Sequence, residues 1–192
     1  VYENNQVAAA RSTVPRLTPV YVGAASCAEC HETKFEGFRH TAHHLSSQMA
    51  SDESIAGDFS SGKNILRPGN PNLQFEMLAD EHGFFQTAVE TLAGERRSRR
   101  ERFDVVIGSG KAGQTYLYWQ GNKLYQLPVS YSRARADWIN SPGYTDGEAD
   151  FRGLISARCL ECHVTYAAPL VPGHEISVEF KKVDFVLGIS CE

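Results

Sequence analysis

The sequence predicts an α+β fold, in which short helices and much irregular chain surround a small, inserted antiparallel β-sheet. Three observations lead to this class: a helix-like apolar spacing after Ser26, short strand-like runs within residues 72–131, and loop-forming stretches rich in glycine, proline and serine around them. The 192 residues suffice for one sizeable domain or two small ones. We expect residues 1–20 to form an N-terminal arm and residues 21–192 to form the principal domain.

The N-terminal part of this domain is predicted to be helical. Ser26 is a residue type that caps helices, and Phe35 and Phe38 have a spacing that a helix places on one side. We therefore expect one or two helices over about residues 28–50. Residues 51–72 carry the glycine, serine, asparagine and proline that are typical of loops.

The inserted sheet is predicted from short runs of β-branched, aromatic and alternating residues. The candidate strands are residues 73–78, 83–91, 102–108, 115–120 and 123–131. Gly121-Asn122 between the last two is a tight-hairpin signal. Cross-strand contacts are expected from Tyr116, Tyr118, Leu124 and Leu127. The basic stretch 95–102 is interpreted as a solvated turn, with binding to acidic groups of a cofactor or partner as the alternative.

The C-terminal part is predicted to contain one short helix and one strand. Residues 132–151 carry several turn signals and are expected to be irregular, and a short helix is expected to carry residues 155–163. Two prolines in AAPLVPG disfavour continuation of that helix. Residues 175–190 alternate weakly and form a candidate strand.

Composition limits the class of protein further. The content of 42% hydrophobic and 22% charged residues is ordinary for a globular protein. The net charge of −4 gives no indication of nucleic-acid binding, and no apolar run approaches membrane-spanning length. We expect neither a nucleic-acid partner nor a membrane span in this chain.

The sequence C-x-x-C-H occurs twice, as CAECH and as CLECH. It is the attachment signature of c-type haem. The two thiols form thioethers with the haem, and the histidine that follows them becomes the proximal ligand of the iron. The fold is therefore expected to be that of a multihaem cytochrome c with short haem-binding helices. The predicted haem c sites are Cys27 and Cys30 with iron ligand His31, and Cys159 and Cys162 with iron ligand His163.

The cysteine pairs also allow three other interpretations. A four-thiolate zinc site does not require a histidine after each pair, and the two pairs are much further apart in sequence than is usual for zinc sites. A dithiol redox pair would sit in a βαβ pattern, which the sequence does not contain. Plain disulfides are the third alternative.

The sixth ligand of each iron is less well defined by sequence. His43 follows His31 by twelve residues, which is about 18 Å along a helix at ~1.5 Å per residue. Two ligands of one iron are only about 4 Å apart, so His43 should serve a different haem from the one that His31 binds. His174 is the other candidate ligand, because a proline-broken loop separates it from His163. We interpret the remaining candidates as exposed polar residues: His40, His44 and His82.

Several motifs together resemble a known family. They are Y-V-G-x-x-x-C-x-x-C-H, then T-A-H, a second C-x-x-C-H and finally G-I-S-C-E, over about residues 20–192. This pattern resembles the family of the tetrahaem cytochrome that accepts electrons from hydroxylamine oxidoreductase. The stretch IGSGKAGQTYLYWQGNKLYQLPVSYS is similar to a bacterial branch whose members often carry tetratricopeptide repeats.

The resemblance implies a third haem site. In the family, the G-x-x-C-E stretch continues into another C-x-x-C-H, so Cys191 would be its first cysteine and the chain would be truncated within that motif. The resemblance also implies that His43 ligates this third haem, and that the second haem lacks a strong distal ligand, which leaves His174 unassigned. The alternative for Cys191 is a free thiol.

The expected function is electron transfer through closely packed, covalently bound haems, with no catalytic residues. The resemblance implies a periplasmic, extracellular or cell-surface location, and redox proteins or other copies of the chain as partners. One alternative is an enzyme that acts on a small nitrogen compound at a five-coordinate haem, with Arg158 and Tyr166 as candidate polar groups. Another is a subunit of a polymeric haem wire, in which residues 1–20 dock on the next copy.

Overall fold

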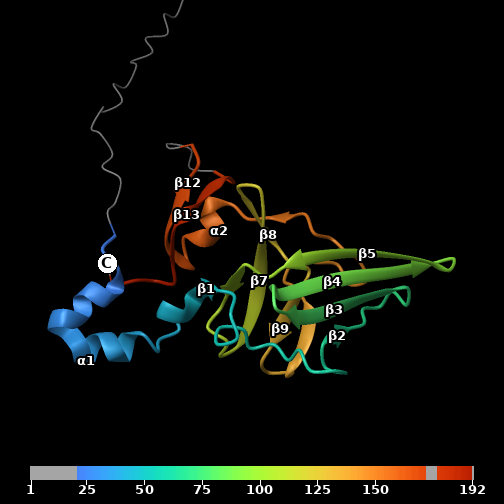
Figure 1. Cartoon of the computed structure of the whole chain (residues 1–192), viewed down its shortest axis with the longest axis horizontal. Helices are drawn as coiled ribbons and strands as arrows, with labels where there is room; N and C mark the ends of the chain where they lie inside the picture. Colours follow the sequence, from blue (N-terminus) through green and yellow to red (C-terminus); the bar gives the residue numbers. More distant parts are fainter. Residues whose placement is uncertain (1–20, 172–176, 192) are drawn as a thin grey trace, which may run out of the picture.

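The protein is predominantly built of β-strands, which corrects the predicted fold class. The computed structural model describes residues 21–171 and 177–191 (Figure 1). Strands make up 43% of the structure and helices 13%, in several antiparallel sheets. The prediction of a helical cytochrome with a small inserted sheet is wrong, because strands also form before and after residues 72–131. The predicted arm, residues 1–20, lies outside the described residues.

The helices are short and lie in the N-terminal segment and around the second motif. They are η1 Ala24–Cys27, α1 Ala28–Phe38, η2 His44–Ser46 and α2 Ala157–Leu160. The helical prediction for residues 28–50 therefore fails after η2, where the chain enters a strand that pairs with β6. No helix in the described part combines the length and the apolar character that a membrane span requires.

The largest sheet is antiparallel and has seven strands. Its main path runs in the order β1, β6, β7, β8, β11, while β9 pairs with β7 and β10 pairs with β9. The predicted hairpin at Gly121-Asn122 is present, with Gln120 opposite Lys123. The bounds are β1 Ser47–Met49, β6 Val105–Ile107, β7 Gly113–Gln120, β8 Lys123–Gln126, β9 Val129–Ser132, β10 Asp137–Asn140 and β11 Gly153–Leu154.

A second sheet has four antiparallel strands in sequence order. These are β2 Ile65–Leu66, β3 Leu73–Asp80, β4 Gly83–Leu92 and β5 Glu95–Arg102. The basic stretch 95–102, expected as a turn, is the edge strand β5, and the turn lies just before it at Ala93-Gly94, where both residues have positive φ. Positive φ at both central residues gives the tight turn that suits a two-residue hairpin. This strand could not be predicted from its highly charged sequence, because almost all of its side chains are exposed and no buried face is apparent in the residue pattern.

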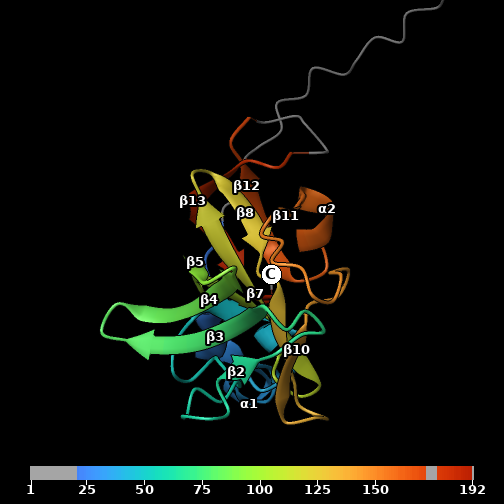
Figure 2. The ribbon, with the colours of Figure 1, turned by 90° about the vertical axis from the view of Figure 1, so that its right-hand side faces the viewer.

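A third sheet pairs β12 Val164–Pro169 with β13 Phe180–Leu187. Figure 2 shows this hairpin beside α2 in the upper part of the view, above β3 and β4. The strand predicted in residues 175–190 is thus present, and the segment after the second motif forms a strand in place of loop. Residues 172–176 between the two strands, including His174, lie outside the described residues.

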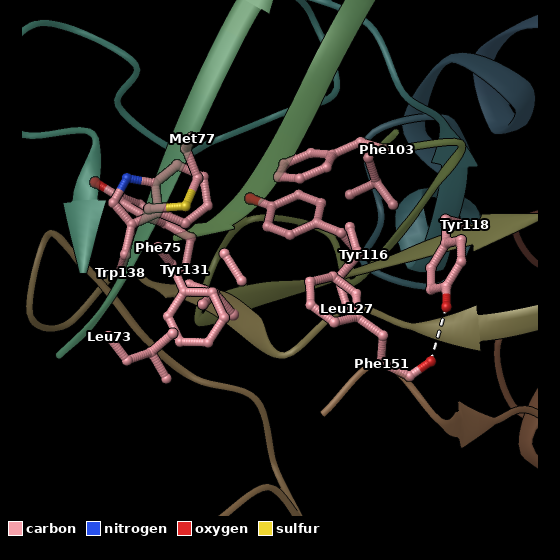
Figure 3. Packing of buried hydrophobic residues seen from close by; sticks show 13 residues of the cluster. Leu73, Phe75, Met77, Phe103, Tyr116, Tyr118, Leu127, Tyr131, Trp138 and Phe151 are labelled. Atoms are coloured by element: carbon pink, nitrogen blue, oxygen red, sulfur yellow. Dashed lines mark hydrogen bonds between the residues drawn. The ribbon is translucent and has the colours of Figure 1, made fainter. Parts of the chain in front are cut away.

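Two apolar cores hold these sheets together. The first core is aromatic: Phe103 stacks on Tyr116 with 4.3 Å between ring centroids, and both lie near Trp138 (Figure 3). The second core joins the large sheet to α2 and to the β12–β13 hairpin. Its buried members are Val105, Leu117, Leu124, Leu160, Val164 and Phe180. Because Leu160 lies between Cys159 and Cys162, the second motif is anchored in a core.

Candidate haem-binding site

The first motif lies on a helix that makes little contact with the protein core. Cys27 is the last residue of η1, and Cys30 and His31 lie in α1. His31 has φ −126° and ψ 36°, so the helix is kinked at the residue that follows the second cysteine. No side chain of α1 is buried, and Figure 1 shows this helix at the far end of the molecule from the β4–β5 hairpin.

The second motif sits at the end of α2, on the rim of the second core. Leu160 is 3% exposed, and the chain turns after it so that His163 directly precedes β12. The backbone N–H of His163 donates to the carbonyl oxygen of Leu160 at 2.9 Å. The Nδ1 atom of His163 is buried and has no hydrogen-bond partner. Both proximal-ligand candidates thus follow a short helical segment and lie where regular helix is interrupted.

The thiols of both motifs are accessible. Cys30, Cys159 and Cys162 are exposed, Cys27 is half-buried, and none of the four forms a disulfide. Among the described residues no group of three or more histidine, cysteine, aspartate or glutamate side chains could hold a metal ion. The two pairs therefore do not converge as a four-thiolate zinc site would require.

The residues at each motif fit a c-type haem. Two reachable thiols and one imidazole follow one another within five residues, which is the donor set that the thioether links and the proximal bond need. A helix without a buried side chain, as in α1, lacks the apolar partner that normally stabilises short helices.

The ladders between the named strands in the described part are antiparallel, so the parallel βαβ frame of thioredoxin-like dithiols is not formed.

The structure brings the segment of Cys191 next to the segment of His43. The backbone N–H of Ile189 donates to the carbonyl oxygen of His43 at 3.0 Å. Cys191 lies two residues further along and is exposed, as is His43. This hydrogen bond brings the two chain segments side by side.

The polar groups considered for an enzyme occupy different surroundings. Arg158 is exposed on α2. Tyr166 is half-buried, and its ring packs against Tyr21 with 5.2 Å between centroids. The ring of Phe38 packs edge-on against His44 with 5.1 Å between centroids.

Three residues near the second motif were missed by the sequence interpretation. The hydroxyls of Ser46 and Ser47 both donate to the carbonyl oxygen of His163, and Gly188 donates its N–H to Ser47. Serine and glycine carry no haem signature, and these positions meet only through the tertiary fold. Nothing in a linear pattern singles them out.

Comparison with known proteins supports the haem interpretation of the first motif. Residues 26–65 match the protein-family model described as cytochrome c554 and c-prime. This match supports a c-type cytochrome, and with it haem c, iron and electron transfer at a general level. It does not extend to the second motif, and the tetrahaem family and the repeat-bearing branch stay predictions. Searches of curated proteins and of solved structures gave no match.

Proposed function

We propose that this chain is a multihaem electron-transfer protein with haem c attached at both C-x-x-C-H motifs. The observation that carries the proposal is that both motifs occupy the same local setting: a short helical segment, accessible thiols, and a histidine where the helix breaks. Bound haem supplies an iron that accepts and releases one electron. The protein's part is to bind each haem, to present His31 and His163 as ligands, and to limit water around it.

We further propose that Cys191 begins a third attachment site whose iron is ligated by His43. The hydrogen bond between Ile189 and His43 supports this, because it fixes the backbone of the two segments side by side. The distance estimated from the sequence applies only in part, because α1 ends at Phe38 and the chain from Arg39 to His43 forms turns. His174 remains a candidate ligand from outside the described residues.

A periplasmic or extracellular location belongs to this proposal, because the family match supports a protein that acts outside the cytoplasm. The partners that we propose are redox proteins, and other copies of the chain if haems are to form a longer conducting path. The net charge of −4 is compatible with protein partners and offers no basis for nucleic-acid binding.

Intact-mass spectrometry of the wild-type protein tests the proposal directly. Haem should be added covalently at both complete motifs, and the Cys27→Ser/Cys30→Ser and Cys159→Ser/Cys162→Ser variants should each lose one haem. A wild-type mass equal to that of the bare polypeptide, or a colourless preparation with zinc bound, would overturn it.

Carbon monoxide separates electron transfer from the enzyme alternative. Six-coordinate haems with two strong protein ligands should leave the spectrum of the reduced protein unchanged when carbon monoxide is added. A shifted spectrum would show an open iron position, which the family resemblance implies for the second haem, and would keep catalysis on a small molecule as the alternative.

A further inference from the structure

The carbonyl oxygen of His163 accepts two hydroxyl hydrogen bonds from a distant part of the chain. Ser46 Oγ donates at 2.9 Å and Ser47 Oγ donates at 2.7 Å. These serines lie 117 and 116 residues before His163, at the junction of η2 and β1. The carbonyl oxygen of His163 is therefore held by two adjacent residues, of which Ser47 begins a strand of the large sheet.

The two serines are themselves fixed by backbone contacts. Ser47 is 2% exposed, and its Oγ accepts the N–H of Gly188 at 2.9 Å. The carbonyl oxygen of Ser46 accepts the N–H of Gly108 at 2.7 Å. Gly188 has φ +69°, and a Cβ at this position would lie 2.1 Å from the carbonyl oxygen of His44. Only glycine allows this close approach, so the chain after β13 can reach Ser47.

The backbone immediately before and after the side chain of His163 is also fixed. Its N–H is bonded to Leu160, which is anchored in the second core, and Val164 is 5% exposed and pairs with Leu187. With the peptide groups on both sides held, the imidazole can reorient only by rotation about its own side-chain bonds. The serine hydroxyls add a further restraint at the carbonyl group of His163.

We infer that Ser46 and Ser47 are positioning residues that set the orientation of His163 as the proximal ligand of the second haem. The inference rests on the proposed haem attachment at Cys159 and Cys162. Groups that do not touch a metal can still determine ligand orientation and basicity, and the reduction potential of a haem responds to both. Through its hydrogen bond with Gly188, Ser47 also links the proposed second haem site to the chain segment three residues before Cys191.

The test compares serine variants of the haem-loaded protein. Ser46→Ala, Ser47→Ala and the double variant remove the donors, while Ser46→Thr keeps a hydroxyl at a half-buried position. Ser141→Ala is a matched control, since Ser141 is also 2% exposed and donates to a backbone carbonyl, that of Leu127, at 2.7 Å. Each variant is examined by electron paramagnetic resonance of the oxidised protein, by redox titration and by urea unfolding.

The haem signals are assigned first with the Cys159→Ser/Cys162→Ser variant, in which the second haem's signal disappears. The double serine-to-alanine variant should then shift the g-values and midpoint potential of the second haem and leave the first unchanged. Ser46→Thr should retain the wild-type signal, and Ser141→Ala should lower only the urea midpoint. If the double variant loses stability as Ser141→Ala does but keeps the wild-type signal of the second haem, the serines are merely structural and the inference is overturned.

The single variants keep the test decisive if the double variant does not fold, because each retains one of the two donors. A shift of the second haem in either single variant supports the inference, and unchanged signals in both overturn it. The mass of the wild-type protein is measured first. If no haem is attached, the proposed function is overturned, and this outcome is distinguishable from a failure of the inference about the serines.

Discussion

Loss of the first haem should unfold α1 while the sheets remain folded. The perturbation is the Cys27→Ser/Cys30→Ser variant, which removes both thioether links of the first motif. The reason is that α1 has 11 residues and none of them is buried. Once the haem is absent, only local helix propensity holds this segment.

The expected size of the effect follows from helix–coil energetics. With a nucleation constant of about 10⁻³ and propagation near 1.6 at best, an isolated helix of this length is fully formed in at most about 15% of molecules. Haem contact that buries about 100 Å² of apolar surface, such as that of Phe35 and Phe38, would contribute ~2.5 kcal/mol. That free energy corresponds to a roughly 60-fold slower amide exchange in the haem-bound helix.

Hydrogen exchange followed by mass spectrometry measures this difference segment by segment. Peptides from α1 should be protected in the wild-type protein and exchange close to the unfolded rate in the variant, while β3 and β4 keep their protection. The Cys159→Ser/Cys162→Ser variant is the matched control, since it loses the same number of links but leaves α2 anchored by Leu160. Equal protection of α1 in the wild-type and the first-motif variant would refute the reasoning.

Three further predictions concern stability. Leu160→Ala should lower the free energy of unfolding by about 2–5 kcal/mol, because it opens a cavity in the second core; an unchanged urea midpoint would contradict this. Burial raises the pKa of Tyr118 to about 12, so the folded state holds this proton more tightly than the unfolded state, whose pKa is about 10. Stability should therefore fall as pH rises from about 10 to 12, and less steeply in Tyr118→Phe; equal slopes in urea titrations would count against the assignment. Hydrogen bonds from Asn140 and then from the N–H of Gly69 lower the pKa of Asp146. Its stabilisation should be complete above its unfolded pKa of about 4 and be lost as pH falls through the lower folded value, so the stability difference between wild type and Asp146→Asn should shrink on acidification, and a constant difference would refute it.

The sequence predicted the hairpins better than the balance of helix and strand. Strand-forming residue types and the Gly121-Asn122 signal correctly predicted β3, β4, β7 and the β7–β8 turn. Only β3 alternates between buried and less buried residues, because β4 and β7 each contain a run of consecutive buried residues. β1 could not be predicted from local pattern, since it has three residues and exists through pairing with β6. β5 was predicted as a turn because of its charges, and β10 was predicted as irregular chain because of the turn residues around it.

The candidate site divides in a similar way. The covalent chemistry of c-type haem is local, so the prediction of each attachment site rests on five consecutive residues. The support of the second site is not local. Leu160 is indistinguishable from any apolar residue until the second core is seen, and Ser47 contacts His163 although they lie 116 positions apart in the sequence. Distal iron ligands belong to the same non-local class, which is why the sequence left them open.

The edge strand β5 also constrains how copies of this molecule could associate. It lies at one end of its sheet and carries five arginines and two glutamates, of which Arg96 and Arg100 are already paired with Glu76 and Asp80 of β3. Two such edges brought together would face arginine with arginine, and exposed charge of this kind discourages edge-to-edge joining of sheets. Any filament of this protein would therefore have to grow through other faces, and this rim would stay in solvent along its length.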